Sequence, residues 1–554
     1  MKKYLALGAL FLAASASAQN IYQNAEISST SDVIGTSRYV SMGGAMGALG
    51  ADISAIGNNP ASIGLFRKSD ISLTAGLLWP KDRTYDEGDN LTHGTFDQLG
   101  FVAAMHLDEP NVKFVNVAFN YQKKFNFANA FYADNGDTRG LSQVDNLASI
   151  SNYNNYYNEY NLLGTAYNSW VMDDVRDSDG KLLYYKNSYS AYKNRYTHYS
   201  TGSTQAFDLN VSTNIKDRYY LGLTLGIENV NYDRYSLYAE EREGNLASDP
   251  VGVSPRIMDY SLYNDQSIDG YGLNFKVGGI VRPIEENPLR VGLTIESPTW
   301  YRLKSKTWHS IDSKFEVDAN GNGSHVDYYD TYGNYVNTGV YVTHNGYDES
   351  YLEYILRTPW RARLAIGSTL DQYLAWDIEY EYANYGKNRM KYPDDGDYYE
   401  SSSFAGVADK GANRENKNVF RGQHTVRAGV EFKPSADWAI RFGYNYISSI
   451  YKKGARLNQY IDSPALDYMT STNYMNLSDA NVLACGIGYR HNRFYIDMTY
   501  KFRQQNGEFY AFDDSFSSEG QFVADNPGLA NIKLQPVDVN LNRHTITWTM
   551  GFKF

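Results

Sequence analysis

The sequence predicts an all-β protein, a transmembrane barrel of fourteen antiparallel strands with a small N-terminal plug in its lumen. Three observations carry this prediction. Apolar and polar residues alternate with a period of two from about residue 69 onward, short connections alternate with long ones, and an export signal precedes the whole. Short turns at one end and long loops at the other are the plan of an outer-membrane barrel. A soluble β-sandwich does not segregate its loops in this way.

The first element is a signal peptide, residues 1–18. Two lysines are followed by a short apolar run and by small residues that end at Ala18, so we expect cleavage before Gln19. The apolar run is shorter than the roughly 20 residues that span a bilayer. The chain is therefore expected outside the cytoplasm, where its lone Cys485 fits an oxidising compartment.

Residues 19–68 form the plug, because they are rich in glycine and small apolar residues and show no strand pattern. A short helix is expected over 45–55, with Gly57 as its stop. About 50 residues are too few for a strong independent core. We therefore expect this segment to lie inside the barrel, where small side chains permit close packing.

The barrel itself is expected over residues 69–554. In the strand at 218–233, Leu221, Leu223 and Leu225 share one face, and Gly222 and Thr224 lie on the other. With no amphipathic helix available to cover the apolar faces, lipid is the expected partner. The largest loop covers 129–202, and the long connections 234–267 and 298–350 are also expected as loops. The strands are expected at 69–79, 96–107, 111–128, 203–215, 218–233, 268–282, 288–297, 351–369, 373–386, 421–433, 438–447, 480–490, 493–505 and 542–554.

The last strand ends in an aromatic signature. Trp548, Phe552 and Phe554 alternate with polar residues, and Phe554 is the C-terminus. A terminal Phe on an alternating strand looks like the signal read by the outer-membrane assembly machinery. The alternative is that these residues are simply the last strand of a β protein.

Composition excludes other classes. The mean hydropathy of −0.52 excludes a helical membrane protein, and the net charge of −12 argues against a nucleic-acid partner. One Cys excludes a disulfide framework or Cys-rich metal site, and the nine His lack metal spacing. We therefore expect no metal, no cofactor and no enzymatic activity. Since His198 and His309 lie near tyrosines, a haem-binding loop remains a lesser alternative.

The expected luminal face is highly charged, and two interpretations stay open. These residues form either a salt-bridge ladder between strands, or a site where one arginine holds a ligand carboxylate by a bidentate contact. The residues concerned are Arg361, Arg363, Asp377, Glu379, Glu381, Arg427 and Arg441.

Three N-terminal motifs, at 37–45, 52–56 and 59–61, resemble the hatch of the FadL/TodX family, whose Asn-Pro-Ala motif is matched by Asn59, Pro60 and Ala61. Further similarity lies at 290–294, 297–301, 358–360 and 429–432. The resemblance implies a fourteen-stranded outer-membrane barrel of a Gram-negative bacterium. It also implies passive uptake of long-chain fatty acids or other hydrophobic compounds.

By the same resemblance, loops would capture a hydrophobic ligand and hatch movement would release it, either through the lumen or sideways into outer-membrane lipid beside a kinked strand. The gating residues implied are Gly43, Gly44, Asn59, Pro60 and Ala61. Pro60 fixes φ, so Asn59-Pro60 is either a conformational pivot or a rigid turn. Two other functions stay open: a binding or structural protein of this fold, such as a scaffold for surface or secretion machinery, and a barrel enzyme.

Overall fold

The computed structural model describes residues 19–29, 31–81, 91–154, 161–169, 171–176, 180–186, 191–242, 257–316, 328–329, 335–336, 340–392, 406–461, 463–514 and 533–554. The expected signal peptide lies outside the described residues. Among the helices that the structure describes, none is long and apolar enough to cross a membrane.

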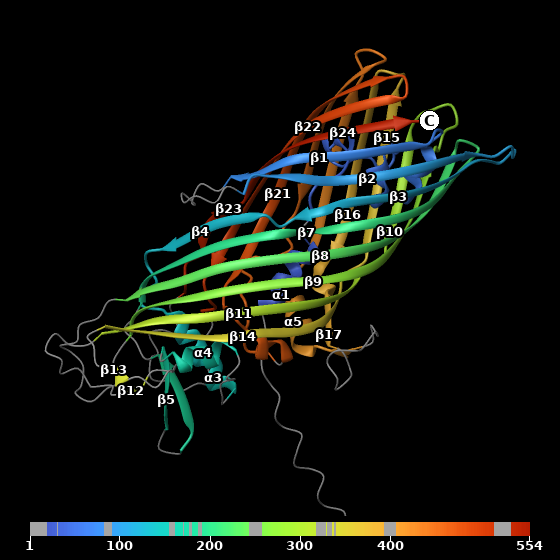
Figure 1. Ribbon diagram of the computed structural model, residues 1–554. Helices are drawn as coiled ribbons and strands as arrows, with labels where there is room; N and C mark the ends of the chain where they lie inside the picture. Colours follow the sequence, from blue (N-terminus) through green and yellow to red (C-terminus); the bar gives the residue numbers. More distant parts are fainter. Residues whose placement is uncertain are drawn as a thin grey trace, which may run out of the picture.

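The wall is a closed ring of fourteen antiparallel strands, as predicted (Figure 1). The first strand closes on the last, with Asp70 opposite Lys553 and Lys81 opposite Asn542. In ring order the strands are β1 (Asp70–Lys81), β2 (His93–His106), β3 (Val112–Asn126), β7 (Ala191–Ile215), β8 (Tyr219–Arg242), β9 (Ile257–Val281), β10 (Arg290–Glu296), β15 (Arg361–Leu370), β16 (Leu374–Asn384), β19 (Gly422–Phe432), β20 (Trp438–Ile447), β21 (Tyr474–His491), β22 (Phe494–Tyr510) and β24 (Asn542–Lys553).

The remaining elements either continue the wall strands or lie inside the ring and at its long-loop end. The other strands are β4 (Asn129–Asn135), β5 (Met172–Arg176), β6 (Leu182–Lys186), β11 (Trp300–Glu316), β12 (Tyr328–Tyr329), β13 (Tyr335–Val336), β14 (Val340–Arg357), β17 (Arg389–Tyr392), β18 (Val407–Ala408) and β23 (Val537–Asn540). The helices are α1 (Gln19–Ser29), α2 (Ser37–Ser41), α3 (Gln143–Asn154), α4 (Leu162–Asn168), α5 (Lys410–Val419) and the 3-10 helices η1 (Ile53–Gly57), η2 (Pro60–Leu65), η4 (Tyr385–Lys387) and η5 (Pro464–Tyr468).

Alternation along the strands places apolar side chains outside and polar ones inside. On β8, Leu223 is 54 % exposed, whereas its neighbour Thr224 is fully buried in the lumen. The same outward exposure holds for Ile378 on β16, Phe442 on β20 and Met550 on β24. An exposed apolar band around a closed ring is the surface that contacts lipid.

Several strands continue far beyond the predicted boundaries, so parts of the expected loops 129–202, 234–267 and 298–350 are strand instead. Above the apolar band the apolar face changes sides. On β8, Leu223 points outward, but Tyr232 and Tyr238 point inward and are almost fully buried. The strands thus continue without an apolar outer face, and for that reason the sequence pattern predicts loops there. These extensions form the long lower-left part of Figure 1.

Two wall strands are interrupted where the sequence has proline. Residues 297–299 separate β10 from β11, and residues 358–360 separate β14 from β15. Pro298 and Pro359 cannot donate to a ladder, so the pairing between these two strands pauses there and resumes in the same register, whereas the pairing with β9 resumes shifted by one residue. The predicted continuous strand at 351–369 is therefore wrong at this point.

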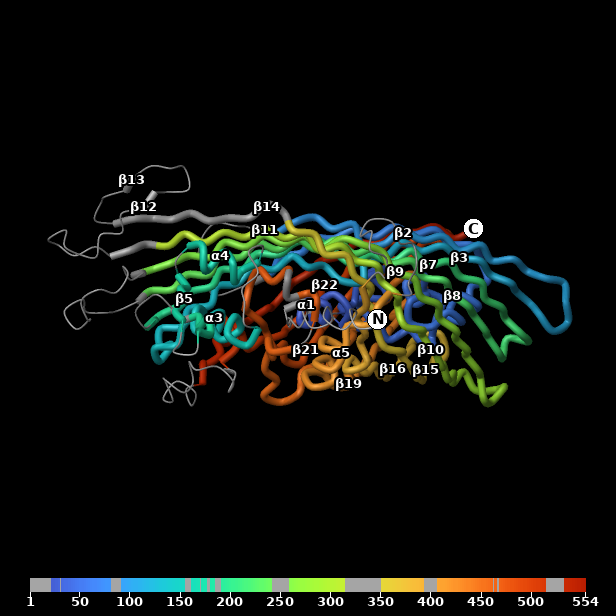
Figure 2. The backbone as a smooth tube through the Cα atoms, turned by 90° about the horizontal axis from the view of Figure 1, so that it is seen from below, coloured from blue at the N-terminus to red at the C-terminus, as the bar shows by residue number. Residues whose placement is uncertain are grey.

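The plug lies inside the ring (Figure 2). The expected helix over 45–55 is not formed. Gly43, Gly44 and Gly50 have φ of 64°, 79° and 57°, which a right-handed helix does not accept. The segment folds instead as α2, η1 and η2, and η1 ends at Gly57 as expected of a stop.

The depth dependence of the lipid-facing surface is testable on β8. We expect Leu225→Arg, near the middle of the apolar band, to lower the free energy of unfolding by about 2–4 kcal/mol, because it places a charge in hydrocarbon. Tyr219→Arg, at the end of the same face, is expected to cost about 1 kcal/mol or less. Urea titration in lipid vesicles measures both; equal costs would contradict the assignment of the band.

Candidate functional site

The plug touches the wall most closely at a pair of glycines. A Cβ on Gly443 of β20 would lie 2.0 Å from the Gly43 nitrogen, and a Cβ on Gly43 would lie 2.7 Å from the Tyr444 nitrogen. No side chain fits on either side of this contact. The Gly44 carbonyl in turn accepts a hydrogen bond from Asn58 Nδ2 at 2.9 Å. The predicted gating glycines thus lie where the plug and wall backbones meet.

The Asn-Pro-Ala segment packs against another part of the wall, at β9. Asn59 Oδ1 accepts from the Ala61 amide at 3.0 Å, which caps η2 with Pro60 in its first turn. Asn59 Nδ2 donates to the Gly47 carbonyl at 2.8 Å. A Cβ on Gly278 would lie 2.1 Å from Asn59 Oδ1. This geometry is that of a fixed turn; whether the turn also moves stays a prediction.

Charged side chains bind the plug to three strands of the ring, β16, β19 and β22. Arg38 pairs with Glu431 of β19 at 2.9 Å, and Asp32 pairs with Lys501 of β22 at 2.8 Å. Asp377 of β16 accepts the backbone amides of Ala48 and Leu49 in the plug at 2.9 and 2.7 Å. The plug is therefore held by buried polar contacts.

The predicted luminal charges are brought together, and they pair among themselves. Arg363 bonds Glu381 at 2.8 Å and Glu296 at 2.6 Å, and Arg427 bonds Glu379 at 2.5 Å and Glu381 at 2.8 Å. These contacts form a continuous ladder over β10, β15, β16 and β19. Sequence reasoning missed Glu296, although its inward position on β10 was readable from the alternation.

The remaining two predicted arginines are also engaged. Arg441 bonds Glu431 and Asp497, each at 2.6 Å, and Arg361 donates to the Ser28 carbonyl and to the Tyr385 hydroxyl at 3.1 and 3.0 Å. A ligand carboxylate would have to displace an existing partner from any of these guanidinium groups. The geometry matches the salt-bridge interpretation, and a role in ligand binding stays a prediction.

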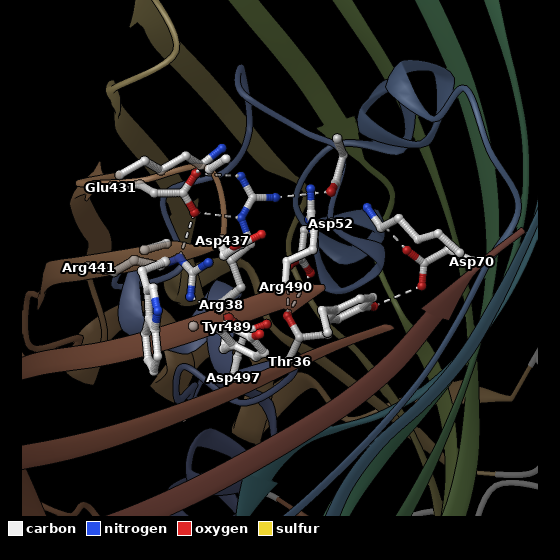
Figure 3. A pocket seen from close by; sticks show the side chains of 18 of the residues that line it. Thr36, Arg38, Asp52, Asp70, Glu431, Asp437, Arg441, Tyr489, Arg490 and Asp497 are labelled. Atoms are coloured by element: carbon white, nitrogen blue, oxygen red, sulfur yellow. Dashed lines mark hydrogen bonds and ion pairs between the residues drawn. The ribbon is translucent and has the colours of Figure 1, made fainter. Parts of the chain in front are cut away.

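A polar cavity of about 250 Å³ lies between the plug and the short-turn end of the ring (Figure 3). Arg38, Asp52 and Glu431 border it, together with Asp70 and Arg490. Thr36 Oγ1 donates to Asp52 at 2.7 Å, and Tyr495 donates to Asp70 at 2.8 Å. Burial raises the pKa of Asp52, although Arg38 lowers it. This lining favours water and ions over apolar molecules.

A second cavity, of about 60 Å³, lies where α1 of the plug meets the wall extensions. Its walls are mostly aromatic. Tyr22 stacks on Tyr451 with ring centroids 5.5 Å apart, and Phe131 stacks on His198 at 4.6 Å. The full lining is Tyr22, Gln23, Glu26, Phe131, His198, Tyr232, Arg234, Tyr451, Asn473, Tyr474, Met475, Leu477 and Phe509.

Among the residues that the structure describes, five polar atoms around this aromatic cavity have no hydrogen-bond partner, and three of them bear on ligand binding: the Tyr22 hydroxyl, His198 Nδ1 and Arg234 Nε. All three side chains are at least nine-tenths buried. Burial lowers the pKa of His198 to about 3, with Arg234 adding to the effect, so its imidazole is neutral at pH 7. Buried polar atoms without partners are rare, and a bound molecule is one way to satisfy them.

The long-loop end of the ring is covered by α3, α4 and the β5–β6 hairpin, which we call the roof. Leu162 of the roof donates its amide to the Met469 carbonyl at 2.8 Å, and Ser142 donates to Glu240 of β8 at 2.8 Å. One apolar cluster runs from Leu147 in the roof to Ile21 in the plug. The lumen is therefore closed on this side in the described structure.

Two other predicted groups lie apart from these cavities. His309 contacts Thr165 of the roof and does not line the aromatic cavity with His198, and within the described chain no three His, Cys, Asp or Glu side chains gather as metal ligands. Trp548, Phe552 and Phe554 lie exposed on the lipid-facing side of the last strand and its end. Their role as an assembly signal stays a prediction.

A closed strand ring with an apolar outer band and a filled lumen defines a multi-pass β-barrel protein of the outer membrane.

No family model and no curated protein matches the sequence. Solved structures with a similar chain fold are found. A Pseudomonas aeruginosa FadL homologue is 11 % identical, with a TM-score of 0.47, and the match covers 95 % of this chain and 99 % of that one.

Two toluene transporters are similar to the same degree. Ralstonia pickettii TbuX is 11 % identical with a TM-score of 0.48, and Pseudomonas putida TodX is 10 % identical with a TM-score of 0.46. In both cases the match covers 94 % of this chain and 99 % of the other.

The hold of the wall on the plug is testable at Glu431, which pairs with Arg38 and Arg441 and is 2 % exposed. Glu431→Gln leaves two buried guanidinium groups short of a counter-charge, which costs about 3 kcal/mol. We expect hydrogen exchange of the Val40 and Met42 amides to accelerate about a hundredfold. Glu285→Gln, in an exposed turn with Arg218 4.0 Å away, is the control. Unchanged exchange in Glu431→Gln would show that the pair does not hold the plug.

Proposed function

We propose that this protein is a passive outer-membrane channel for hydrophobic compounds, with the plug as its gate. The observation that carries the proposal is the aromatic cavity at the junction of α1 with the wall. Its lining is mostly aromatic and apolar. It also contains Arg234 Nε, His198 Nδ1 and the Tyr22 hydroxyl, which have no hydrogen-bond partner among the described residues. Apolar walls with a few convergent polar groups are typical of sites for small organic molecules.

The cavity chemistry favours an amphipathic cargo with one polar or acidic end. Arg234 is anchored through Asn264 at 2.8 Å, which leaves Nε for a further acceptor. Burial raises the pKa of the Glu26 carboxyl, which reduces its repulsion of a second acid. Long-chain fatty acids have this chemistry, whereas the toluene carried by the similar transporters has no acidic end.

The gating part of the proposal follows from size. A cavity of about 60 Å³ holds only a few water molecules, whereas sites for drug-sized ligands measure about 300 Å³ or more. Cargo therefore enters only if α1, which forms one wall of the cavity, moves. Only one segment of backbone connects α1 to the rest of the plug, so α1 can be displaced while the rest stays in place. We therefore expect opening to begin with displacement of α1.

The wall offers a sideways exit near this cavity. The ladder between β2 and β3 stops at Gln98 opposite Gln122, although both strands continue beyond it. A bulge lies at Lys123–Phe125, and the chain then restarts as β4 against β7. An apolar cargo that leaves here enters lipid directly, whereas the polar cavity at the other end of the lumen would oppose it.

The ion-paired plug also supports a second candidate, a structural or binding barrel of the same fold. A plug held by Glu431, Asp377 and Asp32 would remain closed in such a protein. Uptake measurements separate the two candidates.

The uptake experiment uses a reversible lock. Ser28 Oγ of α1 lies 3.1 Å from Asn388 Nδ2, just before β17, so cysteines at both positions can form a disulfide. In a Cys485→Ser background, we expect vesicles with this variant to take up labelled fatty acids or other hydrophobic compounds only after reduction. The same background without the added cysteines is the control. Uptake no faster than in empty vesicles, across several chain lengths, would refute transport.

Selectivity is testable at Arg234. We expect Arg234→Gln to lower uptake of a long-chain carboxylate about tenfold, because a charge-assisted hydrogen bond is lost. Uptake of the alkane of equal length is expected to stay within about twofold. Arg195→Gln, which removes an exposed cation from β7, is the matched control. An equal loss for both cargoes would place Arg234 outside the binding site.

A further inference from the structure

The outer wall carries an apolar groove of about 680 Å³ across β16, β19, β20 and β21. Its sides are aromatic and its floor is made of small residues, with Ala428 and the exposed Cys485 among them. The remaining lining is Trp376, Asp377, Ile378, Gly429, Val430, Phe442, Gly443, Tyr444, Leu483, Ala484 and Tyr500. The groove lies in the lipid-facing band, where the wall otherwise carries large side chains.

The floor of this groove is backed by the plug. Behind Ala428, a Cβ on Gly429 would lie 2.4 Å from the Met42 carbonyl oxygen, and Gly443 contacts Gly43 in the same way. The strand ladders β16–β19, β19–β20 and β20–β21 run unbroken across the groove. The groove is therefore a dent in a closed wall, separate from the luminal cavities and from the exit proposed above.

A cluster of exposed cations lies at the long-loop end of the same strands, which we call the cationic rim: Lys410, Arg414, Lys417, Arg421, Lys452 and Lys453. The first three are spaced four and three residues apart and share one face of α5. In Figure 2, α5 lies beside β19. Lys452 Nζ donates to the Lys417 carbonyl at 2.5 Å, which joins the two loops.

The part of the chain that the structure describes places little counter-charge beside the cationic rim. None of its six side chains forms an ion pair with a described residue, and Glu415, a carboxylate on the same helix, is 4 % exposed and bonded to Asn418. Such a cluster is unexpected in a chain of net charge −12. Basic clusters at a membrane boundary bind anionic lipid headgroups.

The spacing of groove and rim fits one lipid molecule. Arg421 precedes Ala428 by seven residues on one strand, which is about 23 Å at about 3.3 Å per residue. With a strand tilt of about 40°, the height difference is about 18 Å. Half of the hydrocarbon core measures about 15 Å. An acyl chain in the groove thus places its headgroup at the cationic rim.

We propose that the groove and the cationic rim together bind a phosphorylated lipid of the outer leaflet. The acyl chain fills the dent between the aromatic side chains, and the phosphate lies among Lys417, Lys452 and Lys453. The lipid is a fixed partner of the wall and is not the transported cargo.

The test uses native mass spectrometry of the full chain in mild detergent. The probes are dipalmitoyl phosphatidic acid and dipalmitoyl phosphatidylcholine, which share their chains and differ in charge. We expect the wild type to retain phosphatidic acid at least about tenfold better. The triple variant Lys417→Gln, Lys452→Gln and Lys453→Gln is expected to lose this preference. A control triple variant at the opposite end, Lys68→Gln, Lys216→Gln and Arg493→Gln, is expected to keep it.

A second measurement tests the groove without depending on these variants. A bimane label on the lone Cys485 reports a neighbouring chain, and we expect chain-brominated phosphatidic acid at low mole fraction to quench it more than brominated phosphatidylcholine does. Ala428→Trp, which fills the dent, is expected to abolish retention, whereas Leu223→Trp on β8 is expected to leave it unchanged. Equal retention of both lipids, or a preference that survives loss of the three lysines, overturns the proposal, as does binding of inorganic phosphate as tight as that of the lipid.

Discussion

The structure depends on the closing of one hydrogen-bonded ladder. Lipid offers no partner to a backbone N–H or C=O, so a sheet crosses it only if the first strand meets the last. Here β1 and β24 pair over twelve consecutive positions, from Asp70–Lys553 to Lys81–Asn542. The closed ring fixes which residues face inward, and it creates a lumen that the plug and the inward side chains must fill. The luminal ion pairs and both cavities follow from that requirement.

The wall was largely readable from the sequence, because lipid imposes a strict alternation. Leu223 against Thr224, or Phe442 against Arg441, gives each strand an apolar and a polar face over the whole membrane thickness. Above the membrane that constraint ends, and the apolar face turns inward at residues such as Tyr232 and Tyr238. Beyond the membrane, the apolar side chains of a strand can face either inward or outward, so strand extensions and loops look alike in the sequence. The roof could not be predicted either, since its packing depends on contacts such as Leu162 with Met469 that are distant in the chain.

The sequence predicts which charged residues line the candidate site, but not which of them pair with one another. Alternation placed Arg363, Arg427 and Glu381 in the lumen, and the structure places them there. Which carboxylate meets which arginine depends on strand register, and register is not visible in one strand alone. The aromatic cavity was missed for a different reason. Its members come from α1, β4, β7, β8, β21, β22 and the connection between β20 and β21, and the predicted strands stopped short of most of them.

The pairing of the luminal charges shapes any transport mechanism. A buried arginine that already bonds two carboxylates, as Arg363 and Arg427 do, gives up more than it gains by turning to a cargo. In the channel that we propose, recognition would therefore fall to polar atoms that the described fold leaves unpaired, among them the Tyr22 hydroxyl, His198 Nδ1 and Arg234 Nε beside α1. On the mechanism that we propose, a cavity of about 60 Å³ admits cargo only when α1 moves, so binding and opening would be one event. The ion pairs of β10, β15, β16 and β19 join wall strands to one another, so movement of the plug would leave them intact.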